Sequence, residues 1–221
     1  MAKQALIFGA TGAVGRQLLD LCLNGNHYQQ VTVIARRAAP VTHKKLNWII
    51  CEFNEVNNLP MLNDLAGGDS YCCLGTTIKA AGSKEAFRQV DYDGVVAAAK
   101  VAKQAGVKNF SLVSAIGANV NSSSFYSRVK GEVEAALIEA QFSNLRIFRP
   151  SLLKGHRNEF RLKEEVANWL SLLMTPVFYL GLKKYQPIDI DKLARAIYTI
   201  TNNAPCTEAV SIYESDELQA Y

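Results

Sequence analysis

The segment KQALIFGATGAVGRQLLDLCLNG, residues 3–25, decides the fold of this 221-residue chain. Its first apolar run, Gln4 to Phe8, has the length of a strand, and Gly9, Gly12 and Gly15 follow directly. Apolar residues then recur with helical spacing until a further glycine supplies a stop signal. A strand, a glycine turn and a helix together present free backbone N–H groups and a positive helix end to a phosphate. The segment therefore predicts a dinucleotide site, and the alternative is a tight turn that binds nothing.

Each glycine of this turn has a predicted role. Gly9 permits the tight turn, Gly12 lets the backbone approach a pyrophosphate closely, and Gly15 lets the helix pack near the strand. The predicted cofactor contacts of the loop are Gly9, Thr11, Gly12, Ala13, Val14 and Gly15.

Strands and helices alternate along the rest of the chain. Short continuous apolar strands separated by helices indicate a parallel sheet that is covered on both faces. The fold class is therefore α/β, a doubly wound parallel sheet of the Rossmann type with a small C-terminal lid region. The expected strands are 4–8, 31–35, 48–51, 70–74, 110–114, 145–148 and 209–213, and the expected later helices are 87–105, 127–140 and an Asp-capped helix at 187–200.

Composition and charge bound the function. With 49% apolar residues, the chain can bury the core of a single domain, residues 1–221. The net charge of +4 is mild and the basic residues are scattered, so no nucleic-acid partner is expected. The five cysteines lack metal-ligand spacing and mostly lie in apolar patterns, as buried thiols do. No metal is expected. A cytoplasmic location is expected, because buried thiols fit a reducing cytosol, and only three residues precede the first strand, which leaves no room for a signal peptide.

The C-terminal third offers little room for a substrate domain. Residues 156–182 are expected to form a lid over the cofactor cleft. Within it, residues 166–182 carry no charge, but a membrane span needs about 20 apolar residues and polar residues interrupt this stretch. No membrane span is predicted. A lid face, a subunit contact in a homodimer and a membrane-surface patch all stay open for this segment.

A second informative stretch is FSLVSAIGANVNSSSFYSRVK, residues 110–130. A buried strand is expected to end on Ser114, and Tyr126 and Lys130 open a helix four residues apart, so both share one face. A hydroxyl, a phenol and an ammonium that converge on one point make a proton-transfer site. The alternative is structural: a half-buried phenol, a solvated lysine and a serine at a strand end.

These motifs resemble the short-chain dehydrogenase/reductase superfamily: GATGAVG after the first strand, a serine that ends the fifth strand, and YxxxK on the next helix. Further similar motifs are CLGTT at 73–77, VDYD at 90–93, KGEVEAAL at 130–137 and FRPSLL at 148–153. Together they resemble most the small atypical branch of Tat-interacting-protein-like oxidoreductases. The resemblance covers roughly residues 3–215 and implies an NAD(P)-dependent oxidoreductase fold.

The second strand favours NADP as the cofactor. NAD sites usually place an acidic residue about 20 residues past the glycines to hold the ribose 2′-hydroxyl. Here that position falls on Ala35 and Arg36, and Arg37 follows. A fork of N–H donors suits a 2′-phosphate, whereas the plain alternative is a solvated basic turn.

The resemblance implies further roles. Glu52 and Phe53 would lie at the adenine, Leu74, Gly75 and Thr76 at the nicotinamide-side ribose, and Pro150 and Ser151 near the nicotinamide. Lys130 would bind the ribose hydroxyls and favour the phenolate of Tyr126, which would act as general acid or base. Ser114 would orient the substrate oxygen. Asp91 stands where many active relatives carry an Asn of a proton relay, which puts that relay in doubt.

Two functions therefore stay open at this point. In the first, the chain is an NADP-dependent oxidoreductase acting on a small carbonyl, alcohol or nucleotide-sugar-like substrate. In the second, it is a non-catalytic NADPH-binding sensor that acts through a partner. The Ser-Tyr-Lys set favours the first function; Asp91 and the small lid favour the second.

Overall fold

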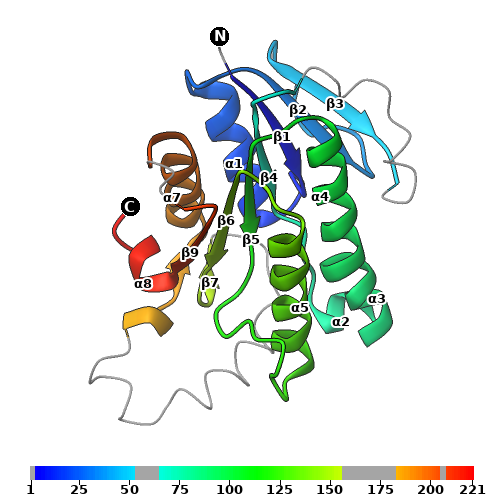
Figure 1. Cartoon of the computed structure of the whole chain (residues 1–221). Helices are drawn as coiled ribbons and strands as arrows, with labels where there is room; N and C mark the ends of the chain where they lie inside the picture. Colours follow the sequence, from blue (N-terminus) through cyan, green and yellow to red (C-terminus); the bar gives the residue numbers. More distant parts are fainter. Residues whose placement is uncertain (1–2, 53–64, 156–182, 205–207) are drawn as a thin grey trace.

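A seven-stranded parallel sheet forms the centre of the protein (Figure 1). The computed structural model describes residues 3–52, 65–155, 183–204 and 208–221. The strands follow the order β3-β2-β1-β4-β5-β6-β9, and every neighbouring pair is parallel. Their bounds are β1 Lys3–Phe8, β2 Tyr28–Ala35, β3 Leu46–Ile50, β4 Asp69–Cys72, β5 Asn109–Val113, β6 Asn144–Arg149 and β9 Val210–Glu214.

Helices cover both faces of this sheet. One face is covered by α1 (Ala13–Asn24) and α7 (Ile190–Asn203), and the other by α4 (Gly94–Gln104) and α5 (Phe125–Glu139) (Figure 1). The shorter elements are α2 Ile78–Ala81, α3 Lys84–Arg88, the π-helical turn η3 Gln89–Asp93, the 3₁₀ turn η5 Lys183–Tyr185, α8 Ser215–Leu218, and the paired strands β7 Leu153–Lys154 and β8 Ile188–Asp189.

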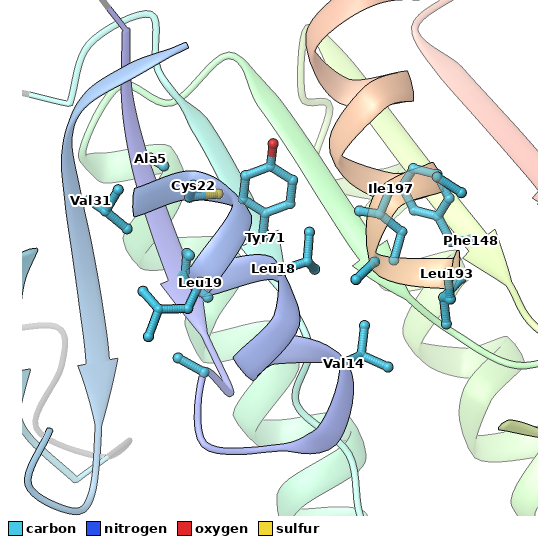
Figure 2. Close-up of a cluster of buried hydrophobic side chains, with 14 of the residues drawn as sticks. Ala5, Val14, Leu18, Leu19, Cys22, Val31, Tyr71, Phe148, Leu193 and Ile197 are labelled. Carbon is cyan, nitrogen blue, oxygen red and sulfur yellow. The ribbon is translucent and has the colours of Figure 1, made fainter. Parts of the chain in front are cut away.

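Two hydrophobic cores hold these layers together, one on each face of the sheet. Figure 2 shows one of them, in which Leu18 of α1 and Ile197 of α7 cover Tyr71 and Phe148 of the sheet. The central strand β1 is buried on both faces, which explains its nearly continuous apolar sequence. The predicted fold class, a doubly wound parallel sheet, is confirmed, and the strand order reverses between β1 and β4.

The prediction of a single helix over 87–105 is wrong in one respect, because these residues do not form one regular α-helix. Helix α3 begins earlier, at Lys84, and the π-helical turn η3 separates it from α4. A π turn inserts one residue into the helical repeat, and apolar periodicity does not reveal a single insertion. The turn carries Asp91, whose side chain is fully buried.

The segment expected as an Asp-capped helix at 187–200 also differs. Its first residues form β8, which pairs in parallel with β7, and α7 begins only at Ile190. Asp189 occupies the N-cap position but its side chain makes no capping hydrogen bond. The residues expected to form the lid, 156–182, lie outside the described residues.

Candidate cofactor and proton-transfer site

The glycine turn between β1 and α1 is built so tightly that two of its positions exclude a side chain. Gly9 has a φ of +79°, and a Cβ there would lie 2.6 Å from the carbonyl of Cys73. A Cβ on Gly15 would lie 2.2 Å from the Gly9 oxygen, so the first turn of α1 packs directly on the loop. Gly12 is the N-cap of α1, and its N–H donates to the Gly9 oxygen at 3.0 Å. The turn therefore brings the positive end of α1 to the strand ends.

A cleft of about 500 Å³ opens beside this turn. It lies at the carboxyl ends of β1, β2 and β4, where open α/β sheets bind their ligands. Eight predicted cofactor residues line it: Gly9, Thr11, Gly12, Arg36, Arg37, Leu74, Gly75 and Thr76. A dinucleotide fits this lining, because Gly9, Thr11 and Gly12 line the cleft at the N-terminus of α1, and neither glycine places a side chain there.

The cleft has a further wall that the sequence did not reveal. It is formed by α2, α3 and the start of η3, and its residues are Ala80, Ala81, Ala86, Gln89 and Val90. The available signals were the caps: the side chains of Thr77 and Ser83 accept hydrogen bonds from the N–H groups of Ala80 and Ala86, both at 3.1 Å. Two cap residues six positions apart indicate two short helices.

Arg36 and Arg37 lie at the mouth of the cleft, and both are exposed. The indole N–H of Trp48 donates to the Arg37 carbonyl at 2.8 Å and fixes the turn that carries both arginines. Among the described residues that line the cleft, none is an aspartate or glutamate. This end of the cleft is therefore suited to an anion.

Behind the opposite wall, Lys130 forms a buried ion pair with Asp91. Its ammonium lies 2.7 Å from Asp91 Oδ1, and the other carboxylate oxygen accepts the N–H of Thr76 at 2.8 Å. A Cβ on Gly75 would lie 3.5 Å from Asp91 and 3.7 Å from the Lys130 ammonium, so the pair lies directly behind the cleft wall. Burial alone would lower the pKa of Lys130, but the charges of Asp91 and Tyr126 outweigh it and raise the pKa above 10.5.

Tyr126 lies one helical turn before Lys130 on α5, as predicted from the spacing. Its side chain is 36% exposed, and its ring packs against Phe87 with the centroids 5.6 Å apart. Tyr126 therefore combines access to solvent with a nearby ammonium.

The hydroxyl of Ser114, the residue predicted to orient the substrate oxygen, is bound to a carboxylate in this structure. Its hydroxyl is buried and donates to Glu134 Oε1 at 2.5 Å. Glu134 is also buried, and Arg149 binds both of its carboxylate oxygens. Hydrogen bonds to Glu134 raise the pKa of Arg149 further. The structure thus brings Lys130 to the cleft wall and takes the Ser114 hydroxyl to a different partner.

The remaining predicted residues that the structure describes are not among those that line the cleft. Ala13, Val14 and Gly15 belong to the first turn of α1. Ser151 is buried, and its hydroxyl donates to the Gln186 carbonyl and accepts from Ser215 at 2.9 Å. Pro150 follows β6, Glu52 is exposed beyond β3, and Phe53 lies outside the described residues.

The described part of the chain shows neither a cluster of metal ligands nor a membrane-spanning helix. No group of three His, Cys, Asp or Glu side chains in these segments is arranged to hold a metal ion. No helix within the same segments is long and apolar enough to cross a membrane.

Comparison with known proteins places this chain in a family. A family model described as NAD(P)H-binding matches residues 9–154. Protein HTATIP2 of Rattus norvegicus is 39% identical over 75% of this chain and 69% of its own length. Protein FMP52-1, mitochondrial, of Scheffersomyces stipitis is 39% identical over 69% of this chain and 68% of its own length.

Solved structures share the fold at low identity. MoeE5 in complex with UDP-glucose and NAD has a TM-score of 0.66 at 13% identity, covering 98% of this chain and 80% of its own. Human epimerase family protein SDR39U1 with NADPH has a TM-score of 0.60 at 18% identity, covering 97% of this chain and 77% of its own. These neighbours bind either NAD or NADPH, so they do not distinguish the two cofactors.

The expected cytoplasmic location is contradicted by the yeast relatives, which are named mitochondrial proteins. The expectation rested on reduced, buried cysteines, and such thiols do not distinguish one reducing compartment from another. The chain belongs to the NAD(P)H-binding family, in the atypical short-chain dehydrogenase/reductase branch that contains Protein HTATIP2 and the FMP52 proteins.

Proposed function

We propose that the protein is an NADP-dependent oxidoreductase that transfers a hydride to or from a small carbonyl, alcohol or nucleotide-sugar-like substrate. One observation carries the proposal. A single cleft joins the glycine turn and two arginines to the loop of Gly75 and Thr76, and the buried ammonium of Lys130 lies directly behind that loop.

The two ends of the cleft have different roles in this proposal. The glycine turn holds the pyrophosphate, and Arg36 and Arg37 bind the 2′-phosphate of NADP with their guanidinium groups. The loop of Leu74, Gly75 and Thr76 lies along the ribose on the nicotinamide side. The absence of a carboxylate among the described lining residues supports NADP over NAD.

Tyr126 supplies the proton in the proposed reaction. A free phenol has a pKa of about 10, and a nearby ammonium lowers it by favouring the phenolate. Lys130 provides that ammonium one helical turn away, while NADPH supplies the hydride. Tyr126 donates a proton to the substrate oxygen when a carbonyl is reduced, and takes one back when an alcohol is oxidised.

The test is turnover of NADPH with a panel of small carbonyl compounds and keto-sugar nucleotides. Tyr126→Phe is expected to lower kcat by at least about a hundredfold, because it removes the general acid. Tyr221→Phe, which changes an exposed phenol at the C-terminus, is the control and is expected to match wild type. Equal rates for Tyr126→Phe and wild type would refute the proposed role of Tyr126.

A second candidate function is a non-catalytic NADPH sensor that acts through a partner. The Asp91 carboxylate favours it, because a negative charge 2.7 Å from Lys130 offsets part of the ammonium charge that would activate Tyr126. A sensor would bind NADPH tightly and reduce no member of the panel. An oxidoreductase would reduce at least one member in a Tyr126-dependent manner.

A further inference from the structure

The hydroxyl of Ser114 has one hydrogen, and that hydrogen is committed to a carboxylate. Ser114 Oγ donates to Glu134 Oε1 at 2.5 Å, the short distance of a charge-assisted bond. Both residues are buried, with 6% and 4% of their surfaces exposed. A serine in this state accepts a hydrogen bond from a substrate hydroxyl but has no hydrogen left for a substrate carbonyl.

Arg149 binds the same Glu134 carboxylate that accepts the hydrogen bond from Ser114. Its guanidinium binds both oxygens of Glu134, at 3.1 and 2.5 Å, and donates its remaining arm to Glu214 at 3.0 Å. Ser114 is also fixed through its backbone, since its N–H donates to the Phe148 carbonyl at 2.8 Å. The chain of contacts therefore ties the ends of β5, β6 and β9 to the middle of α5.

The positions along α5 separate this cluster from the phenol. Tyr126, Lys130 and Glu134 lie at intervals of four residues on one helix. At 1.5 Å of rise per residue, Glu134 lies about 12 Å along the helix axis from Tyr126 and about 6 Å from Lys130. Side chains on a helix all lean toward its N-terminus, so the lean does not remove this separation between the phenol and Glu134.

We propose that Glu134 is a positioning residue: it holds Ser114 and Arg149 in a buried cluster that fixes α5, and the Ser114 hydroxyl does not donate to the substrate oxygen. This inference rests on the proposed function, and it reduces the proton-transfer unit to Tyr126 with Lys130. Glu134 acts through the helix that carries both residues, not by touching substrate or cofactor.

The first experiment compares kcat and KM in the full chain with saturating NADPH, using the carbonyl compound that wild type reduces fastest. Ser114→Ala is expected to lower kcat by less than about tenfold, whereas loss of the general acid costs at least about a hundredfold. Ser114→Thr keeps the donor and is expected to restore the wild-type value. A loss of tenfold or more in Ser114→Ala with an unchanged Kd for NADPH would overturn the proposal.

The second experiment does not depend on turnover. The Kd for NADPH is measured by fluorescence at a temperature at which circular dichroism shows each variant to be folded. Glu134→Gln is expected to raise the Kd by more than about threefold, because a helix that is less firmly held places Lys130 less well. Glu132→Gln, on the same helix but outside the cluster, is the matched control.

Equal Kd values for Glu134→Gln and Glu132→Gln would also overturn the proposal. If wild type binds NADPH but reduces no carbonyl, the oxidoreductase function fails while the binding comparison still decides the role of Glu134. The two failures are therefore distinguishable.

Discussion

The ammonium of Lys130 lies 2.7 Å from the carboxylate of Asp91, and both side chains are almost completely buried. The same carboxylate accepts the N–H of Thr76 in the loop that lines the cleft. Asp91 is thus a shared partner of the cleft wall and of helix α5. The π-helical turn η3 is the element that carries it to this place.

Removal of the Asp91 charge is expected to destabilise the protein, because it leaves a buried ammonium without its counter-charge. Asp91→Ala should lower the free energy of unfolding by about 3–5 kcal/mol. Asp91→Asn should cost less, since an amide oxygen still accepts from Thr76. Asp93→Asn, an exposed change in the same turn, is the control. Urea unfolding measures all three, and equal stability of Asp91→Ala and Asp93→Asn would show that the ion pair contributes nothing.

The raised pKa of Lys130 predicts how stability depends on pH. Burial lowers this pKa, but Asp91 and Tyr126 outweigh burial, so the folded state holds the proton more tightly than the unfolded state. The resulting stabilisation is fully present below the ordinary value of 10.5 and is lost as the pH rises through the higher folded value. The stability difference between wild type and Lys130→Met should therefore shrink above pH 10.5, whereas the difference for the exposed Lys100→Met should stay small.

The arginine pair predicts cofactor preference. Arg36→Ala and Arg37→Ala should each weaken NADPH binding by about 10- to 150-fold, since each removes a charge-assisted contact of roughly 1.5–3 kcal/mol. NADH binding should change little, because NADH lacks the 2′-phosphate. Lys44→Ala, an exposed basic residue that does not line the cleft, serves as the control. Fluorescence titration of each variant with NADPH and with NADH measures these changes in Kd. Tighter binding of NADH than of NADPH by wild type would contradict the predicted preference for NADPH.

Much of the fold and part of the site follow from the sequence, for physical reasons. Parallel strands that are buried on both faces need nearly continuous apolar sequences. Runs such as residues 4–8 therefore predict the strands of the sheet. The glycine turn can also be predicted from the sequence, because its backbone geometry excludes side chains at Gly9 and Gly15 and so requires glycine there. These features are local, and local sequence specifies them.

Other features depend on contacts between distant segments. Glu132 and Glu134 both lie in KGEVEAAL, yet only Glu134 is buried, because Ser114 and Arg149 reach it from two strands. The spacing of apolar residues likewise does not show that one extra residue is inserted in a helix. The π-helical turn that carries Asp91, and with it the burial of Asp91, was therefore not predicted. The roles given to Ser114, Tyr126 and Lys130 stay predictions.

At Gly15 we expect alanine to destabilise the protein, although helix propensity alone would predict that alanine stabilises it. Alanine inside a helix normally stabilises by about 0.5–1 kcal/mol relative to glycine. In Gly15→Ala the new Cβ would lie 2.2 Å from the Gly9 oxygen, so the turn and α1 must move apart. Such overpacking costs about 1–3 kcal/mol, and Gly15→Ala should therefore lower the free energy of unfolding.

Gly12→Ala is the informative comparison for this prediction. Its Cβ would meet the Gly9 oxygen at 3.2 Å, a contact that a small shift relieves, and its φ of −76° suits any residue. Gly12→Ala should keep most of the stability but weaken NADPH binding, because Gly12 lines the cleft. Urea unfolding and fluorescence titration of both variants separate the two roles. If Gly15→Ala were as stable as wild type, α1 would not pack on the turn as closely as the structure describes.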